Sequence, residues 1–115
     1  MENLNTVDSI LDALEKAAER KGDTSPEFWI DGCQKLLALL GNEEDRYYEL
    51  EHLLAKVKME AMMEGDTSAK AKVKAEARAE HLEAKKLKAK INRVFEMIRI
   101  AKVRAKMATD EYKSN

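Results

Sequence analysis

The chain has 115 residues, of which 37% are charged, and it includes one Pro, four Gly and six aromatic residues. Ala, Leu, Glu and Lys, which favour helices, are abundant, whereas residues that favour strands and turns are scarce. This composition excludes a β-sandwich, a β-barrel and an α/β fold with alternating strands. It predicts an all-α protein that forms a single compact unit.

The small net charge of −1 conceals a separation of charge along the chain. Residues 1–67 carry 16 acidic and 7 basic side chains, whereas residues 68–115 carry 6 acidic and 14 basic side chains. Such asymmetry is typical of chains that bind nucleic acid or an acidic partner. It also arises when two oppositely charged halves neutralise each other, within one chain or between two chains.

The sequence lacks the signals of a membrane or secreted protein. Its longest apolar run, residues 36–40, is far shorter than the roughly 18 residues that a membrane span needs. The first residues lack the basic segment and apolar core of a secretory signal. The single cysteine, Cys33, excludes an intramolecular disulfide and fits a reducing compartment. We therefore expect a cytoplasmic protein with no membrane partner.

Two short helices are predicted in residues 1–41. The first spans about residues 6–21, with Asn5 as its N-cap and Gly22 after its last residue. Its inward face has the i, i+3, i+4, i+7 spacing and consists of Val7, Ile10, Leu11 and Leu14. The second spans residues 26–40, with Ser25 as its N-cap and Gly41 as its stop. Its apolar face consists of Trp29, Cys33, Leu36, Leu37 and Leu40.

Two longer helices are predicted in residues 42–115. One begins after Asn42 and ends at Gly65, and the other runs without Gly or Pro from about residue 68 to residue 110. Both repeat apolar residues at alternating spacings of 3 and 4, which is the pattern of a coiled-coil seam. The seams are Tyr47, Leu50, Leu54, Val57 and Ala61, and Ala84, Leu87, Ile91, Val94, Ile98, Ala101 and Ala105.

The short connection near Gly65 makes these two helices antiparallel. We therefore expect a long, coiled-coil-like antiparallel helical hairpin over residues 42–115, preceded by two short N-terminal helices. A break in the last helix near Ala79 that leaves markedly less helix than expected would contradict this arrangement. The expected register pairs Val57 with Val73, Leu54 with Ala77, and Tyr47 with Ala84.

The end of the last helix is apolar on more than one face, which indicates burial on more than one face. The N-terminal helices are one candidate cover, and a second copy of the chain is the other. We expect a homo-oligomer. The candidate face for self-association or for another partner consists of Phe95, Met97, Ile100, Val103 and Met107.

Few residues suggest chemistry. His52 points away from its seam, and the Glu-x-x-His spacing of a di-iron bundle occurs once, from Glu49 to His52, where such a site needs it twice. His81 flanks a seam and is interpreted as a surface residue. Cys33 lies on an apolar face without a basic neighbour to lower its pKa. We expect no catalytic, metal or cofactor site, and therefore no enzyme.

Two sets of residues suggest binding. Met59, Met62 and Met63 lie just before the predicted turn, where they either fill the core or form an adaptable docking tip. A long basic helix can also follow phosphates without reading base sequence. This candidate nucleic-acid face consists of Lys70, Lys74, Arg78, Lys86, Lys90 and Arg93.

Residues 28–36, 39–44, 64–72 and 91–99 together resemble small helical-hairpin accessory proteins of tailed bacteriophages. The likeness covers about residues 26–107 and rests on caps, a turn and heptads. It implies an accessory protein made in the bacterial cytoplasm that docks on host or phage machinery. It carries over no catalytic residues.

The sequence therefore predicts a non-catalytic protein-docking module that acts as a phage accessory factor or inhibitor on a host or phage protein complex. One alternative is an accessory nucleic-acid-binding protein that uses the basic face of its last helix. Another is a coiled-coil structural or assembly factor of virions.

Overall fold

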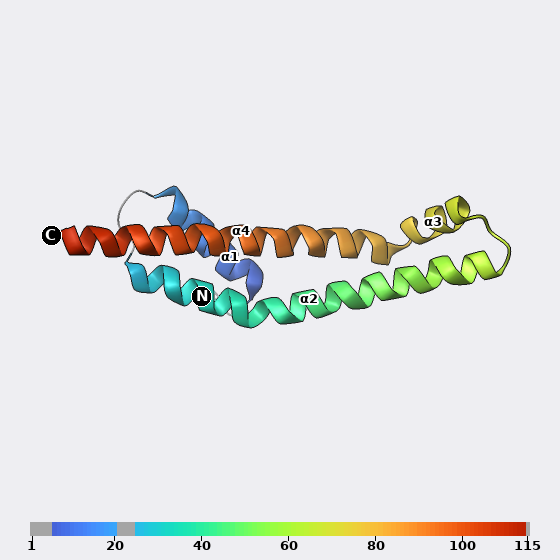
Figure 1. Ribbon diagram of the computed structural model, residues 1–115, viewed down its shortest axis with the longest axis horizontal. Coiled ribbons are helices and arrows are strands. Elements are labelled where there is room, and N and C mark those ends of the chain that lie inside the picture. The colour runs from blue at the N-terminus through green and yellow to red at the C-terminus, as the bar shows by residue number, and fades with distance from the viewer. Residues whose placement is uncertain (1–5, 21–24, 115) are drawn as a thin grey trace. The chain divides into compact units, whose positions relative to one another are not determined.

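A computed structural model of the protein describes residues 6–20 and 25–114, and it contains only helices over these residues (Figure 1). In chain order the helices are α1 (Val7–Glu19), α2 (Pro26–Met63), α3 (Ser68–Glu76) and α4 (Ala79–Ser114). The all-α prediction is confirmed. The chain divides into two compact units, and both long helices contribute to each. Unit 1 is built from the described parts of residues 1–41 and 92–115, and unit 2 from residues 42–91.

Helix α1 of unit 1 begins where its first turn is capped. The Thr6 hydroxyl accepts a hydrogen bond from the Ser9 amide at 3.1 Å, and Asp8 in the first turn suits the helix dipole. The expected cap Asn5 and the expected stop Gly22 lie outside the described residues. The helix ends at Glu19, two residues earlier than predicted. All four residues of the predicted stripe are buried: Val7, Ile10, Leu11 and Leu14.

The core of unit 1 forms where α1 meets the first part of α2 and the last part of α4. Two polar contacts connect these helices: the buried Cys33 thiol lies 3.7 Å from the Ile98 carbonyl, and Arg104 donates to the Ala18 carbonyl at 2.8 Å. The core is apolar throughout the described residues. Beyond the α1 stripe it contains Trp29, Cys33, Leu36, Leu40, Val94, Met97, Ile98 and Ala101.

The predicted stop at Gly41 is wrong. Ser25 and Pro26 begin the helix as expected, with the Phe28 amide donating to the Ser25 hydroxyl at 3.4 Å, but α2 then continues to Met63. Glycine inside a helix costs only about 1 kcal/mol relative to alanine. The buried Leu36, Leu40 and Leu50 share one face of an uninterrupted helix. Burial on both sides of Gly41 therefore outweighs the local signal.

Unit 2 begins with the second part of α2, which ends near Gly65 as predicted. Gly65 has a φ of 110°, a conformation that favours glycine, and the Asp66 amide closes the turn by donating to the Ala61 carbonyl at 3.0 Å. Thr67 then caps α3, because its hydroxyl accepts from the Lys70 amide at 3.2 Å.

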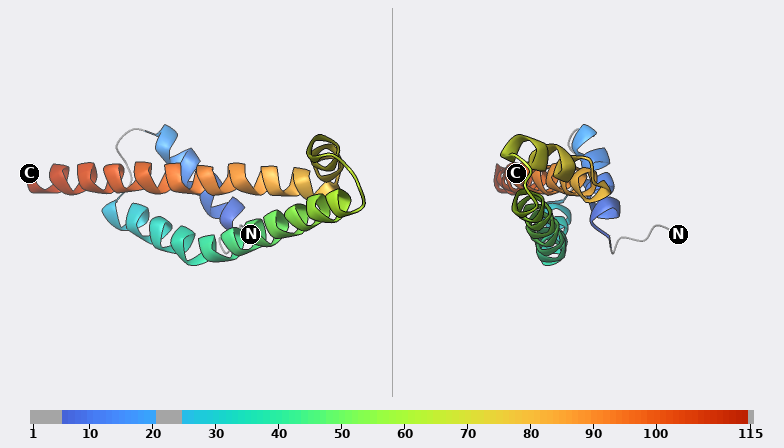
Figure 2. Two further views of the ribbon diagram at one scale, coloured as in Figure 1. Left: turned by 45° about the vertical axis from the view of Figure 1, so that its right-hand side comes forward. Right: turned by 90° about the vertical axis from the view of Figure 1, so that its right-hand side faces the viewer.

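The helix predicted over residues 68–110 is interrupted at Ala77 and Arg78, which separate α3 from α4. Figure 2 shows the axis of α3 turned away from that of α4. On one continuous helix, the buried Ala75 and Ala84 would be nine residues apart and would point in opposite directions. The break allows both residues to be buried. It also leaves Val73 65% exposed, so its expected pairing with Val57 is wrong.

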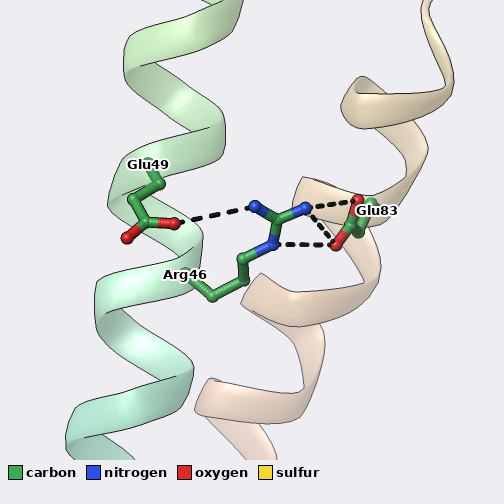
Figure 3. Close-up of polar contacts among 3 residues, drawn as sticks. All are labelled: Arg46, Glu49 and Glu83. Carbon is green, nitrogen blue, oxygen red and sulfur yellow. Dashed lines mark hydrogen bonds and ion pairs between the residues drawn. The ribbon is translucent and has the colours of Figure 1, made fainter.

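An exposed salt bridge connects α2 with α4 inside unit 2 (Figure 3). Arg46 donates to both carboxylate oxygens of Glu83, from Nε at 3.0 Å and from Nη2 at 3.3 Å. Its remaining nitrogen, Nη1, lies 3.6 Å from a carboxylate oxygen of Glu49. Bidentate pairing fixes the geometry of both side chains, but exposure to solvent keeps its contribution to stability small.

Replacing Gly41 by Ala is expected to raise the free energy of unfolding by about 1 kcal/mol, because the residue is exposed inside a helix. An added Cβ would meet no atom of the described residues within 4 Å. Gly32→Ala is the matched control, since its Cβ would lie 2.7 Å from the buried Leu14 side chain. Urea denaturation should show a gain for Gly41→Ala and no gain for Gly32→Ala. A loss for Gly41→Ala would contradict a continuous α2.

The Cys33 thiol is expected to react slowly in the folded protein. Burial raises the pKa of the thiol and outweighs the opposing effect of Lys102. A smaller fraction of the thiol is therefore present as the reactive thiolate at neutral pH. Reaction with Ellman's reagent at pH 8 should be more than about tenfold slower in buffer than in denaturant, because unit 1 must open first. Equal rates in the two solutions would contradict the packing of Cys33 against α4.

Candidate functional site

The six residues of the predicted nucleic-acid face are distributed over several elements. Five of them belong to unit 2, whereas Arg93 belongs to unit 1. Lys70 and Lys74 lie in α3, Arg78 lies in the break, and Lys86 and Lys90 lie in α4. Because α3 and α4 have different axes, these residues do not form the expected stripe along one helix.

At least three members of this set are already in ion pairs. Lys74 pairs with Asp66, and the hydrogen bond between them raises the pKa of Lys74. Arg78 lies 2.9 Å from a carboxylate oxygen of Glu80. Arg93 pairs with Glu15 across unit 1. Lys70 and Lys86 are exposed, and Lys90 is half-buried. The described contacts thus use part of this charge within the chain.

The predicted partner face of α4 needs one correction. Met97 is buried in the core of unit 1, because it shares the inward face of α4 with Val94 and Ala101 at spacings of 3 and 4. Phe95, Val103 and Met107 are each about half exposed, and Ile100 is half-buried. These four residues are therefore accessible on α4, whereas Met97 is not.

The methionines before Gly65 are exposed, so the interpretation that they fill the core is wrong. Met59, Met62 and Met63 are 63%, 45% and 80% exposed, whereas Ala61 of the seam is buried. Each lies one or two positions away from the buried Ala61, which turns it towards solvent. Together with Ala55 and Lys58 they line a hollow of about 490 Å³. We call this surface the methionine hollow.

A second groove in unit 2 was not predicted from the sequence. It has a volume of about 490 Å³ and lies between the described parts of α2, α3 and α4. Small side chains, Ala55, Ala75 and Ala84, line it together with Leu54. We call it the alanine groove. Its polar lining consists of Tyr47, Glu51, Lys58, Lys72, Glu76, His81, Lys85 and Lys88.

The lining of the alanine groove is mainly basic, with four lysines against two carboxylates. The Tyr47 hydroxyl donates to Glu51, a hydrogen bond that raises the pKa of Tyr47. The Lys88 ammonium lies 5.2 Å from the centre of the Tyr47 ring, within the range of a cation–π contact. Lys72 lies 3.8 Å from Glu76. Both carboxylates therefore already have partners in the groove.

The break between α3 and α4 explains why this groove was not predicted from the sequence. A continuous helix would turn Ala75 away from Ala84, whereas the observed break brings both to one groove. One signal was present in the sequence: Lys85 and Lys88 follow the seam residue Ala84 at positions that flank the seam.

The two histidines lie in different environments. His81 lines the alanine groove and is half-buried, whereas His52 is exposed. Glu49, which has the Glu-x-x-His spacing to His52, lies near Arg46 instead. Over the described residues, no group of three or more His, Cys, Asp or Glu side chains is placed to hold a metal ion.

Over the same part of the chain, every helix is too short or too polar to cross a membrane. Comparison of the chain with protein-family models, with curated proteins and with solved structures found no match. The geometry of the methionine hollow and of the alanine groove is therefore the basis for the functional proposals that follow.

Proposed function

We propose that this protein is a non-catalytic docking module that binds another protein through the methionine hollow of unit 2. The observation that carries the proposal is the exposure of three neighbouring methionines, Met59, Met62 and Met63, around an apolar hollow. Isolated exposed apolar side chains are common on soluble proteins, whereas a contiguous apolar patch marks an interaction site. The long, polarizable side chain of methionine adapts to partner surfaces of different shape.

The proposed biological role is that of a phage accessory factor or inhibitor that acts on a host or phage protein complex in the bacterial cytoplasm. The resemblance over residues 26–107 supports this role. The proposal includes the antiparallel, coiled-coil-like hairpin as the scaffold that presents the methionines. It also includes self-association through the accessible residues of α4, which are Phe95, Ile100, Val103 and Met107.

A competition assay tests the docking role. A photoreactive amino acid replaces Tyr48, which is 64% exposed, lies on the same helix as the methionines and does not line the methionine hollow. Illumination in a bacterial lysate should give a discrete cross-linked protein. Excess unlabelled wild-type protein should suppress this product, whereas a Met59→Ser, Met62→Ser, Met63→Ser variant should need at least about tenfold more protein, as expected when interface anchors are removed.

The matched control carries three serine substitutions at other exposed apolar positions, Ile30, Val73 and Leu82. It should compete as well as the wild type. Both variants should keep the helical circular dichroism of the wild type, because exposed substitutions change stability little. Equal competition by the methionine variant and the wild type would contradict docking through the hollow, as would the absence of any suppressible product.

A further inference from the structure

We infer that the alanine groove binds an amphipathic α-helix of a partner protein that carries carboxylates along both edges of its docking face. This inference rests on the proposed docking function and adds the chemistry of the partner. The groove and the methionine hollow share Ala55 and Lys58, and their other lining residues differ.

The shape of the groove suits a helix. Its apolar lining consists mainly of alanines contributed by three different helices, Ala55 from α2, Ala75 from α3 and Ala84 from α4. Small side chains let helices approach closely, at the lower end of the usual 8–10 Å between axes. A partner helix can place a row of apolar side chains at i, i+3, i+4 and i+7 against this lining.

The charges of the groove define the edges of the partner helix. Each of the three helices that form the groove contributes lysine to its lining: Lys58 from α2, Lys72 from α3, and Lys85 and Lys88 from α4. Among the described residues, neither Lys58 nor Lys85 has a carboxylate within ion-pair distance. Glutamates on the edges of a docked helix would supply these missing partners and fix its register.

Nucleic acid fits the same groove less well. Glu51 and Glu76 line it beside the lysines and would repel a backbone that carries a charge at every nucleotide. The Lys88 ammonium already lies over one face of the Tyr47 ring in the groove, so that face is taken before a base could stack on it. A protein helix can place its carboxylates next to the lysines and leave the positions near Glu51 and Glu76 uncharged.

The test measures binding of a defined probe by fluorescence anisotropy. The probe is a fluorescein-labelled helical peptide of about 20 residues with a Leu and Ala stripe and Glu on both flanks. The full-length protein should bind it saturably at about 50 mM salt. A Lys58→Glu, Lys85→Glu, Lys88→Glu variant should bind at least about tenfold more weakly, because three attractive contacts become repulsive.

A charge-matched variant separates the groove from general electrostatics. It carries Lys70→Glu, Lys86→Glu and Lys106→Glu, three exposed lysines that do not line the groove. It should lose much less affinity for the acidic peptide than the groove variant, because its substituted lysines do not line the groove and salt weakens the effect of charges outside it. A peptide with Lys in place of every Glu should not bind. Equal weakening of the two variants would overturn the groove as the site.

Two other outcomes would overturn the inference. One is that the acidic peptide shows no saturable binding at concentrations up to about 1 mM. The NMR chemical shifts of the groove alanines are the readout of this binding. The other is that a single-stranded oligothymidylate binds and is lost in the groove variant, while the peptide does not bind; the groove then serves nucleic acid. The competition assay substitutes only methionines of the hollow, so either proposal can fail while the other holds.

Discussion

Burial of apolar side chains along one face of each helix is the interaction on which both units depend. Throughout the described residues the buried side chains are apolar, with Leu14, Leu36, Leu50 and Val94 among the most completely buried. Burying one such side chain stabilises a fold by about 1.5–3 kcal/mol, whereas an exposed ion pair contributes about 1 kcal/mol or less. The salt bridges therefore contribute little to the stability of the fold. The surface charges are thus available for recognition of a partner.

Local signals in the sequence predicted the helix ends wherever backbone chemistry decides them. Ser25 and Gly65 act as expected, because a cap or a positive φ depends on the residue itself. The prediction failed at Gly41 and at Ala77, where packing decides. At Gly41 burial on both sides keeps the helix intact, and at Ala77 the need to bury two alanines interrupts a sequence that favours helix throughout.

A candidate site that lies on one helix was easier to predict from the sequence than a site built from several helices. The methionine hollow lies on α2 alone, and the sequence offered it as one of two interpretations. The alanine groove needs three helices and a break that no local signal marks, so periodicity within one helix could not predict it. Met97 was misassigned for a related reason. It extends a second apolar stripe in the sequence, but it is buried in the core of unit 1.

The interruption at Ala77 and Arg78 also divides the hydrogen-bond ladder of the basic half of the chain. Helix α3 has nine residues, fewer than the roughly 12 that an isolated helix needs, and its buried side chains are Ala71 and Ala75. Fraying of α3 exposes little more than two methyl groups and does not unwind α4, because the two helices are separate ladders. Local unfolding of this segment is thus decoupled from the rest of unit 2, and within that unit the amide protons of α3 exchange first.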